Sequence, residues 1–207
     1  MQLSRTKILD AGLEILDSYG LADLTMRRLA TRLGVAPGAL YWHFANKQTL
    51  IESIARRILD PMLPEGDSST RDWPEASHGD REATPGAPES AAHWCTRLRA
   101  ALLRRRDGAE LVGAAVAMTS LHGELLTELE TRLAADTDRS VGAATLLHFV
   151  LGSTVLEQSA RQAAAATGTT PADTVGETGQ PSPATTEFDR GIEIILTGLS
   201  GAGTSGN

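Results

Sequence analysis

The chain has 207 residues, one cysteine and a formal net charge of −7. A chain of this length can bury a hydrophobic core without covalent cross-links, and a single cysteine excludes an intrachain disulfide. The charge argues against non-specific binding of a polyanion until it is divided along the chain. Residues 1–60 hold eight Lys/Arg and six Asp/Glu, a net of +2, whereas the rest hold eleven and twenty, a net of −9. The N-terminal part is therefore the candidate for contact with nucleic acid.

Neither a signal peptide nor a membrane span is predicted. The N-terminus, MQLSRTKILDAGLEILD, is amphipathic and lacks a basic segment followed by an apolar run. The longest apolar run, residues 141–156, is shorter than the roughly 20 residues that a spanning helix needs, so it predicts a buried helix. We expect a cytoplasmic protein with no membrane partner, in which Cys95 is a partly buried thiol.

Two helices are predicted before residue 35. The first covers RTKILDAGLEILDSY and ends at Gly20, and its apolar positions recur at spacings of three and four: Ile8, Gly12, Ile15, Leu16 and Tyr19. Thr25 is placed to cap the second helix, MRRLATRL, which ends at Gly34.

A third and a fourth helix follow. Pro37 suits the first turn of a short helix, PGALYWHF, because its missing N–H would be unpaired there in any case. Asn46 is placed to cap the next helix, which Pro61 and Pro64 stop. Its apolar stripe consists of Leu50, Ile51, Ile54, Ile58 and Leu59.

The remaining chain alternates polar loops with helical patterns and contains no useful strand pattern. Residues 64–90 predict a polar linker or loop, and a mobile loop is expected near 166–186. Helical patterns begin near residue 91, and the last one spans 188–199. The expected division is a helix-turn-helix domain at 1–46 (the head), a connecting helix at 47–63, the linker at 64–90 and a helical domain at 91–200 (the body). The predicted fold class is all-α.

The two short helices joined by Gly-Val-Ala match a helix-turn-helix, whose last helix enters the DNA major groove. Tyr41 and Trp42 would offer apolar faces and one donor each, and Arg27 could fork onto a guanine edge. His43 and Lys47 would add polar side chains that can contact the DNA, with Lys47 near a phosphate. The alternative is that the rings pack a small core. Spacing leaves both readings open for Tyr41 and Trp42, and favours the core for Leu40 and Phe44.

The segment LTMRRLATRLGVAPGALYWHFANKQTL, residues 24–50, closely resembles the DNA-binding domain of the tetracycline-repressor (TetR) family of bacterial transcription factors. The T-x-R-x-L-A helix, the Gly-Val turn and the L-Y-W-H-F-x-N-K run carry the resemblance. It implies DNA contacts by Arg27, Gly38, Tyr41, Trp42, His43 and Lys47, and core positions for Leu29, Leu33, Val35, Leu40 and Phe44. The sequence departs from the tetracycline repressor at residues 36–39, so the resemblance does not imply a particular operator sequence.

The resemblance continues into the body. RAALLRRRDGAEL, LHFVLGSTVLEQ and FDRGIEIILTGL are similar to three segments of the regulatory domain of the tetracycline repressor. That similarity implies a homodimer whose long helix and last helix form a four-helix interface with the partner. The small residues Gly142, Ala143, Ala144 and Gly152 agree with close helix packing. His148 is expected to be an interior or interface histidine.

The same resemblance implies a small-molecule site, but without the magnesium chemistry of the tetracycline repressor. Val112 replaces the histidine expected after RDGA, Trp94 and Leu98 replace an asparagine and a phenylalanine, and Leu63 replaces a second histidine. Glu157 is the acid that remains, and one carboxylate is a poor magnesium site. We expect no metal or cofactor. We expect an unidentified effector in a site lined by Trp94, Leu98, Val112, His122 and Glu157. Ordinary packing remains open for each of these residues.

The sequence contains no H-E-x-x-H, no G-x-S-x-G and no Gly-rich phosphate loop, so an enzyme is not expected. The predicted function is a repressor that binds double-stranded operator DNA as a homodimer and is released by a small-molecule effector. The alternative is a constitutive or protein-controlled DNA-binding regulator, because the ligand residues of the tetracycline repressor are those that this sequence replaces.

Overall fold

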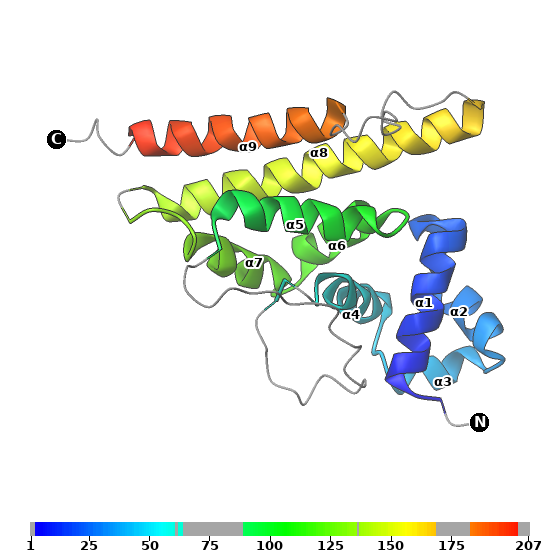
Figure 1. The fold of residues 1–207 in the computed structure, drawn as a ribbon. Helices are drawn as coiled ribbons and strands as arrows, with labels where there is room; N and C mark the ends of the chain where they lie inside the picture. The colour runs from blue at the N-terminus through cyan, green and yellow to red at the C-terminus, as the bar shows by residue number, and fades with distance from the viewer. Residues whose placement is uncertain (1–2, 61, 64–88, 136, 169–182, 203–207) are drawn as a thin grey trace.

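The fold is taken from a computed structural model that describes residues 3–60, 62–63, 89–135, 137–168 and 183–202. These ranges are helical and contain no strand, which confirms the all-α class. Figure 1 shows the head, built from α1, α2 and α3, at one end of a layered helical body, with α8 and α9 forming the layer farthest from α3.

The head consists of α1 (Arg5–Tyr19), a 3-10 turn η1 (Leu21–Asp23), α2 (Met26–Leu33) and α3 (Pro37–Tyr41). The predicted caps are confirmed: the Thr25 side chain accepts a hydrogen bond from the Arg28 N–H at 3.1 Å, and Gly34 ends α2 in the left-handed conformation at φ 66°. Local sequence chemistry therefore sets the start and the end of α2.

The apolar stripes of α1 and α4 meet in the core of the head, where Ile8, Ile15, Leu16 and Ile54 are fully buried. Tyr19, predicted to belong to the stripe of α1, is 48% exposed. The Arg28 guanidinium lies 3.8 Å from the centroid of its ring, so the ring is covered by a cation and not by the core.

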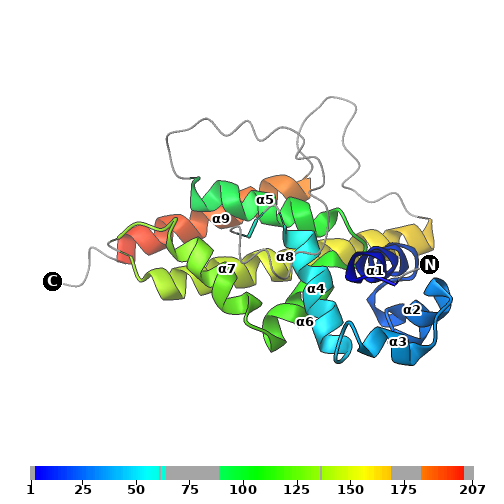
Figure 2. The ribbon, with the colours of Figure 1, turned by 90° about the horizontal axis from the view of Figure 1, so that it is seen from below.

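Helix α4 (Lys47–Leu59) joins the head to the body and begins at the predicted cap, where Asn46 accepts a hydrogen bond from the Thr49 N–H at 2.9 Å. Its predicted stripe is buried, and the helix ends before residue 61. In Figure 2, α4 extends from the head and lies against α6. Most of the predicted linker, residues 64–88, lies outside the described residues. Its last residue, Ser90, caps the next helix.

The body contains α5 (Ala91–Leu103), α6 (Gly108–Met118), α7 (Leu121–Glu130), α8 (Arg139–Thr167) and α9 (Pro183–Ala202). Helices α8 and α9 run antiparallel above α5, α6 and α7 (Figure 1). The loop predicted near 166–186 is shorter than expected, because α8 continues to Thr167 and α9 starts at Pro183 instead of near Phe188. Residues 169–182 lie outside the described residues.

The prediction that residues 141–156 form a buried helix is only half right. Gly142, Ala143, Leu146, Leu147 and Val150 are buried on one face of α8, whereas Val141 and Leu156 are 57% and 72% exposed. One chain supplies neighbours for one side of α8 only. Within the described ranges α8 is the helix that meets the length and hydropathy criteria for crossing a membrane, with 33% of its apolar window buried. Core helices of soluble proteins meet the same criteria, so this finding alone is weak evidence for a membrane span.

Candidate nucleic-acid interface

Helix α3 and the turn that follows it separate four large apolar residues into two groups. Leu40 and Phe44 are fully buried, whereas Tyr41 is 52% exposed and Trp42 is 91% exposed. The burial predicted for Leu40 and Phe44 is confirmed. For Tyr41 and Trp42, the core reading is wrong, because both rings lie on the protein surface.

Helix α3 is shorter than predicted. It ends at Tyr41, and Trp42 and His43 form a turn instead of continuing the helix to residue 44. Ala36 precedes the helix and supplies no side-chain cap, and five residues make barely more than one turn, which is marginal without outside support. The amide N–H of Phe44 still donates to the Leu40 carbonyl at 2.9 Å, so the turn stays attached to the helix.

The N-terminal end of α3 presents almost no side-chain volume. Pro37 and Gly38 are exposed, and a Cβ placed on Gly38 would have no atom within 4 Å. No side chain with a hydrogen-bonding group projects from Ala36, Pro37, Gly38 or Ala39. A polar base edge could therefore be read in this helix only from Tyr41 onward.

Two of the head's cations are available for a ligand. Arg27, in the first turn of α2, and Lys47, the first residue of α4, are exposed and make no ion pair within the described part of the chain. By contrast, Arg28 pairs with Asp23, and Arg32 pairs with Glu14 at 2.5 Å. We call the predicted DNA-contacting set the reading face: Arg27, Gly38, Tyr41, Trp42, His43 and Lys47. His43 is its one half-buried member.

The predicted ligand residues lie on four body helices, and three of them are completely packed. Trp94, Leu98 and Val112 are at most 1% exposed, and His122 is half-buried. The His122 ring stacks on His148, with centroids 6.2 Å apart. His148 is exposed, so the expectation of an interior histidine is wrong within one chain.

Two of these residues carry polar atoms without a partner. Trp94 Nε1 and His122 Nε2 are buried and make no hydrogen bond with the residues that the structure describes. A buried N–H without an acceptor lowers stability by about 1–3 kcal/mol. An oxygen or nitrogen of a bound molecule beside either atom would remove that penalty.

Glu157 is not a free acid, because Arg99 forms a bidentate pair with it. Arg99 Nε and Nη2 donate to the two carboxylate oxygens at 3.0 and 2.9 Å, Arg161 pairs with the same group, and the Arg99 and Glu157 side chains are each 8% exposed. Sequence reasoning missed Arg99, whose partner lies 58 residues away. Arg99 and Arg161 neutralise the Glu157 carboxylate, which strengthens the case against a magnesium ion there.

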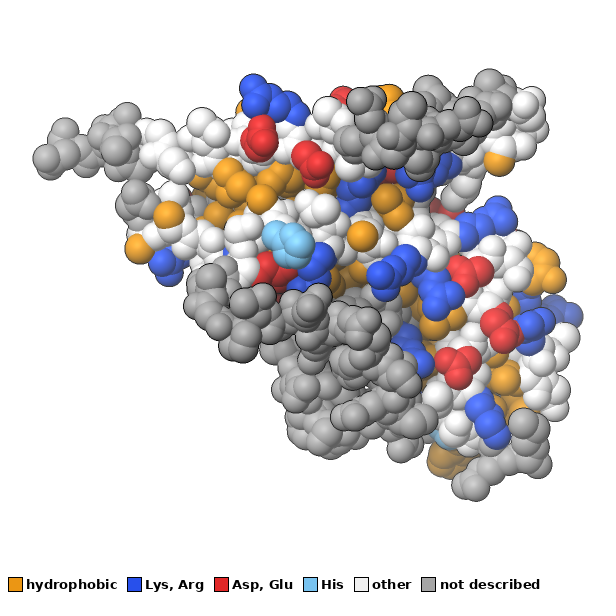
Figure 3. All heavy atoms as spheres, viewed as in Figure 1, with side chains coloured by type: hydrophobic (Ala, Val, Ile, Leu, Met, Phe, Trp, Pro, Cys, Tyr) orange, Lys and Arg blue, Asp and Glu red, His pale blue; other side chains and the backbone are white. Residues whose placement is uncertain are grey.

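An apolar groove of about 490 Å³ runs between α8 and α9. Phe149, Leu156, Phe188, Gly191 and Ile194 line it, and the rings of Phe149 and Phe188 stack 5.6 Å apart. Glu157 is the one predicted ligand residue that reaches this groove. Figure 3 also shows hydrophobic side chains gathered along the body beneath α9.

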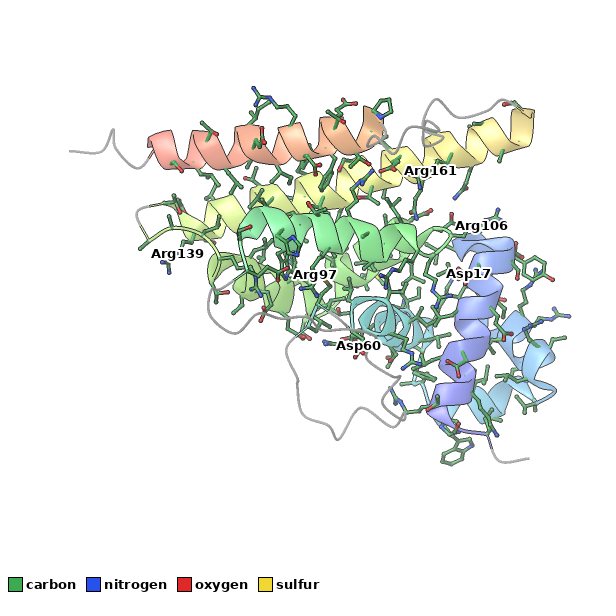
Figure 4. All side chains as sticks on the ribbon, viewed as in Figure 1. Asp17, Asp60, Arg97, Arg106, Arg139 and Arg161 are labelled. Atoms are coloured by element: carbon green, nitrogen blue, oxygen red, sulfur yellow. The ribbon has the colours of Figure 1, made fainter. Side chains whose placement is uncertain are left out.

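The head meets the body along a polar seam formed by residues 17–21 and 105–107. Asp107 accepts a hydrogen bond from the Leu21 N–H at 2.8 Å through one oxygen, and from Gln162 of α8 at 2.5 Å through the other. Arg105 pairs with Asp17 at 2.6 Å, and Arg106 donates to the Ser18 carbonyl at 3.2 Å. Figure 4 labels Asp17 and Arg106 on the two sides of this seam, and Figure 3 shows basic and acidic side chains next to each other there.

The seam constrains the backbone on both of its sides. Asp107 has φ 53°, a conformation that glycine adopts more readily. Gly20 has φ 89°, and a Cβ there would lie 2.5 Å from an oxygen of Asp107. The RDGA run identified in the sequence contains an Asp-Gly turn signal, but nothing in the sequence indicated that Asp107 would contact the head.

A second polar contact joins α4 to the body. Arg56 donates to both oxygens of Glu124 on α7, at 2.7 and 2.6 Å, and to Glu52 on its own helix at 3.0 Å. The hydrogen bonds from Arg56 hold the pKa of Glu124 below its ordinary value, and Glu124 raises the pKa of Arg56. The pair fastens the connecting helix to α7.

Within the described ranges, no group of three or more His, Cys, Asp or Glu residues is placed to hold a metal ion. Burial raises the pKa of the Cys95 thiol to about 12, so this cysteine is a neutral packed thiol and not an activated nucleophile.

Comparison with known proteins points to one family. Residues 8–54 match the family model described as bacterial regulatory proteins, tetR family. The tetracycline repressor protein class C of Escherichia coli is 32% identical over 96% of this chain and 91% of its own length. The class A repressor from transposon 1721, also from Escherichia coli, is 29% identical over the same shares of the two chains.

Solved structures agree with this result. The crystal structure of Mycobacterium smegmatis BioQ has a TM-score of 0.73 and 36% identity, over 97% of this chain and 99% of that one. A structure of BioQ with its natural double-stranded DNA operator has a TM-score of 0.69 and 34% identity, over 96% of this chain and 99% of that one. The chain belongs to the tetR family of bacterial regulatory proteins.

Proposed function

We propose that this chain is a transcriptional repressor that binds operator DNA as a homodimer and is released by a small-molecule effector without the tetracycline–magnesium site. The observation that carries the proposal is the exposed aromatic pair at the end of α3, Tyr41 and Trp42. Trp42 is 91% and Tyr41 52% exposed, while the neighbouring Leu40 and Phe44 are fully buried. Tyrosine and tryptophan are enriched at interfaces, where a partner covers the ring and bonds its polar atom, so this exposed pair favours a binding surface.

In this proposal the six residues of the reading face contact DNA. Tyr41 and Trp42 approach thymine methyl groups, sugars and phosphates, and Arg27 and Lys47 supply charge. A relative with 34% identity is known in complex with its double-stranded operator. In a dimer, the half-sites would be about 34–36 Å apart or a multiple of that distance.

The α8–α9 face supports the homodimer. Leu156 and Ile194 are 72% and 60% exposed in one chain, and both border the groove between these helices. A Cβ on Gly152 of α8 or Gly198 of α9 would meet no atom within 4 Å, so the backbone of a second copy can approach there. Packing α8 and α9 against their symmetry mates would bury this apolar face in a four-helix arrangement.

The body is the proposed site of the effector. Trp94 Nε1 and His122 Nε2 are buried and have no hydrogen-bond partner among the described residues, so a molecule carrying hydrogen-bonding groups would stabilise the body conformation that admits it. Release of DNA requires that the effector bind this conformation more tightly than the operator-binding one. The seam at Asp107, between head and body, and the Arg56 contact, between α4 and the body, are the proposed routes by which a shift in the body would move α3.

The alternative is a regulator without a small-molecule inducer, controlled by a protein or not controlled at all. One observation favours it: Trp94, Leu98 and Val112 are packed to 1% exposure or less. Both alternatives retain the division into head, connecting helix, linker and body at 1–46, 47–63, 64–90 and 91–200. Both also describe a cytoplasmic regulator and not an enzyme.

Footprinting on the DNA that flanks the chain's own gene tests the proposal. We expect protection of two inverted half-sites, and loss of protection when an effector is added from a library of metabolites and antibiotics. Tetracycline with magnesium should leave the footprint unchanged. Protection that no compound relieves would favour the alternative, and an absence of any sequence-specific protection would contradict both.

A further inference from the structure

Arg5, in the first turn of α1, contacts three other parts of the head. Its Nη1 donates to the His43 carbonyl at 3.0 Å and its Nη2 to Ser53 Oγ at 3.3 Å. The guanidinium carbon lies 4.5 Å from the centroid of the Phe44 ring. Ser53 Oγ in turn donates to the Thr49 carbonyl at 2.9 Å, so the contacts extend into the first two turns of α4.

These contacts involve the turn after α3, where the local structure has few stabilising contacts of its own. Helix α3 has five residues and no side-chain cap at its start, and Trp42 and His43 lie in a turn. Carbonyl groups at the end of a helix carry partial negative charge, which a nearby cation stabilises. Arg5 supplies that cation, and its planar fork lets one side chain donate to α4 and to the turn together.

We propose that Arg5 is a positioning residue for DNA recognition, which holds the Trp42–His43 turn and the start of α4 in fixed relation to α1. This inference rests on the proposed function. Trp42 follows α3 and Lys47 opens α4, so both must keep their separation to contact one stretch of DNA. Arg5 is half-buried, and both of its terminal nitrogens donate to protein oxygens, so it acts through these neighbours and not on a phosphate.

Another arginine of the head provides a matched control. Arg32 also forms a contact between helices, with Glu14 of α1, but their side chains are 49% and 58% exposed, and within the described residues neither makes a hydrogen bond or ion pair with α3 or α4. Exposed pairs of this kind contribute little to stability. Replacing Arg32 removes the same charge from the head without removing support from the turn.

The test compares wild type, Arg5→Lys, Arg5→Gln and Arg32→Gln by fluorescence anisotropy with the footprinted operator and with a scrambled duplex, across a salt series. We expect both Arg5 variants to bind operator about tenfold more weakly. Neither Lys nor Gln has the planar guanidinium that donates to the His43 carbonyl and to Ser53 Oγ together. The affinity of Arg5→Gln for scrambled DNA and its salt slope should match those of Arg32→Gln, and those of Arg5→Lys, which keeps its charge, should match wild type. Thermal unfolding of each variant identifies any that fail to fold.

Three outcomes would overturn the inference. A salt slope lower by about one, with operator and scrambled DNA weakened equally, would make Arg5 a phosphate contact. Full operator affinity in Arg5→Lys and Arg5→Gln would leave Arg5 with a structural role at most. If wild type itself does not prefer operator over scrambled DNA, the proposed function fails, and this inference fails with it.

Discussion

The reading face and the head–body seam differ in how their polar groups are satisfied. On the reading face, Arg27 and Lys47 make no ion pair within the described part of the chain, and Trp42 is exposed. Along the seam, Asp17 and Asp107 are each bound to a partner across the boundary. Unsatisfied groups on a surface are available to a ligand, whereas mutually satisfied groups define a fixed geometry. We therefore expect substitutions on the face to change DNA binding alone, and substitutions at the seam to change folding.

The largest effect is expected next to the seam, for Gly108→Ala, the residue after Asp107. A Cβ on Gly108 would lie 2.3 Å from the Leu102 carbonyl oxygen, so the backbone at the start of α6 would have to move. We expect a loss of about 3 kcal/mol in the free energy of unfolding, measured by urea denaturation at fixed protein concentration.

Gly113→Ala in the same helix is the control for that prediction. A Cβ at Gly113 has no neighbour within 4 Å, and alanine favours a helix over glycine, so stability should rise by up to about 1 kcal/mol. Equal effects of the two substitutions would mean that the backbone contact at Gly108 does not constrain the seam.

On the reading face, Trp42→Ala should weaken operator binding by about 1–3 kcal/mol, the scale of a good base contact, while the unfolding transition stays where it is. The ring is 91% exposed, so its removal leaves no cavity. Met118→Ala, which removes a 54% exposed side chain from α6, serves as the control and should leave operator affinity unchanged. A fall in melting temperature for Trp42→Ala would show that the face also supports the fold.

The smallest effect is expected for Glu124→Gln, and it depends on pH. Because Arg56 lowers the pKa of folded Glu124, the pair stabilises the fold at pH values above the ordinary Glu pKa of about 4.3, and this contribution is lost as the pH falls through the lower, folded value. The side chains are 32% and 38% exposed, so we expect a loss of about 0.5–1 kcal/mol at pH 7.

Denaturation at a series of pH values between 7 and 3 measures this effect. The stability difference between wild type and Glu124→Gln should shrink on acidification, whereas Glu14→Gln, which removes an exposed pair with Arg32, should change little at any pH. A difference that grows toward acid pH would contradict the assignment of a lowered pKa.

The features that were predictable from the sequence depend on nearby residues. Caps at Thr25 and Asn46 and the end of α2 at Gly34 each involve contacts within about one turn, and all three are confirmed. Spacing favoured the burial of Leu40 and Phe44, whereas the exposure of Tyr41 followed from the family resemblance alone, because spacing left it open. The family, and with it the class of DNA-binding regulator, was also identifiable from the motif.

The features that were not predictable depend on tertiary contacts. Arg99 meets Glu157, Arg5 meets the His43 carbonyl and Asp107 meets the Leu21 N–H across 58, 38 and 86 residues, and no local pattern indicates such partners. The exposure of Tyr19 was missed for the same reason, because Arg28 covers its ring. Helix α3 was predicted too long because periodicity does not measure how well so short a helix is capped.

The carboxylate of Asp107 has a consequence for how far the two parts of the molecule can separate. One oxygen binds the Leu21 N–H of the head and the other binds Gln162 of α8, and a carboxylate holds its oxygens at a fixed spacing. Hydrogen bonds weaken outside a window of about half an ångström, so a larger shift of α8 past the head requires the Gln162 side chain to change its rotamer or one of the two bonds to break. Asp107 therefore couples the position of the head to that of α8, and hydrogen-bond geometry, not the length of a flexible segment, sets how closely the two are coupled.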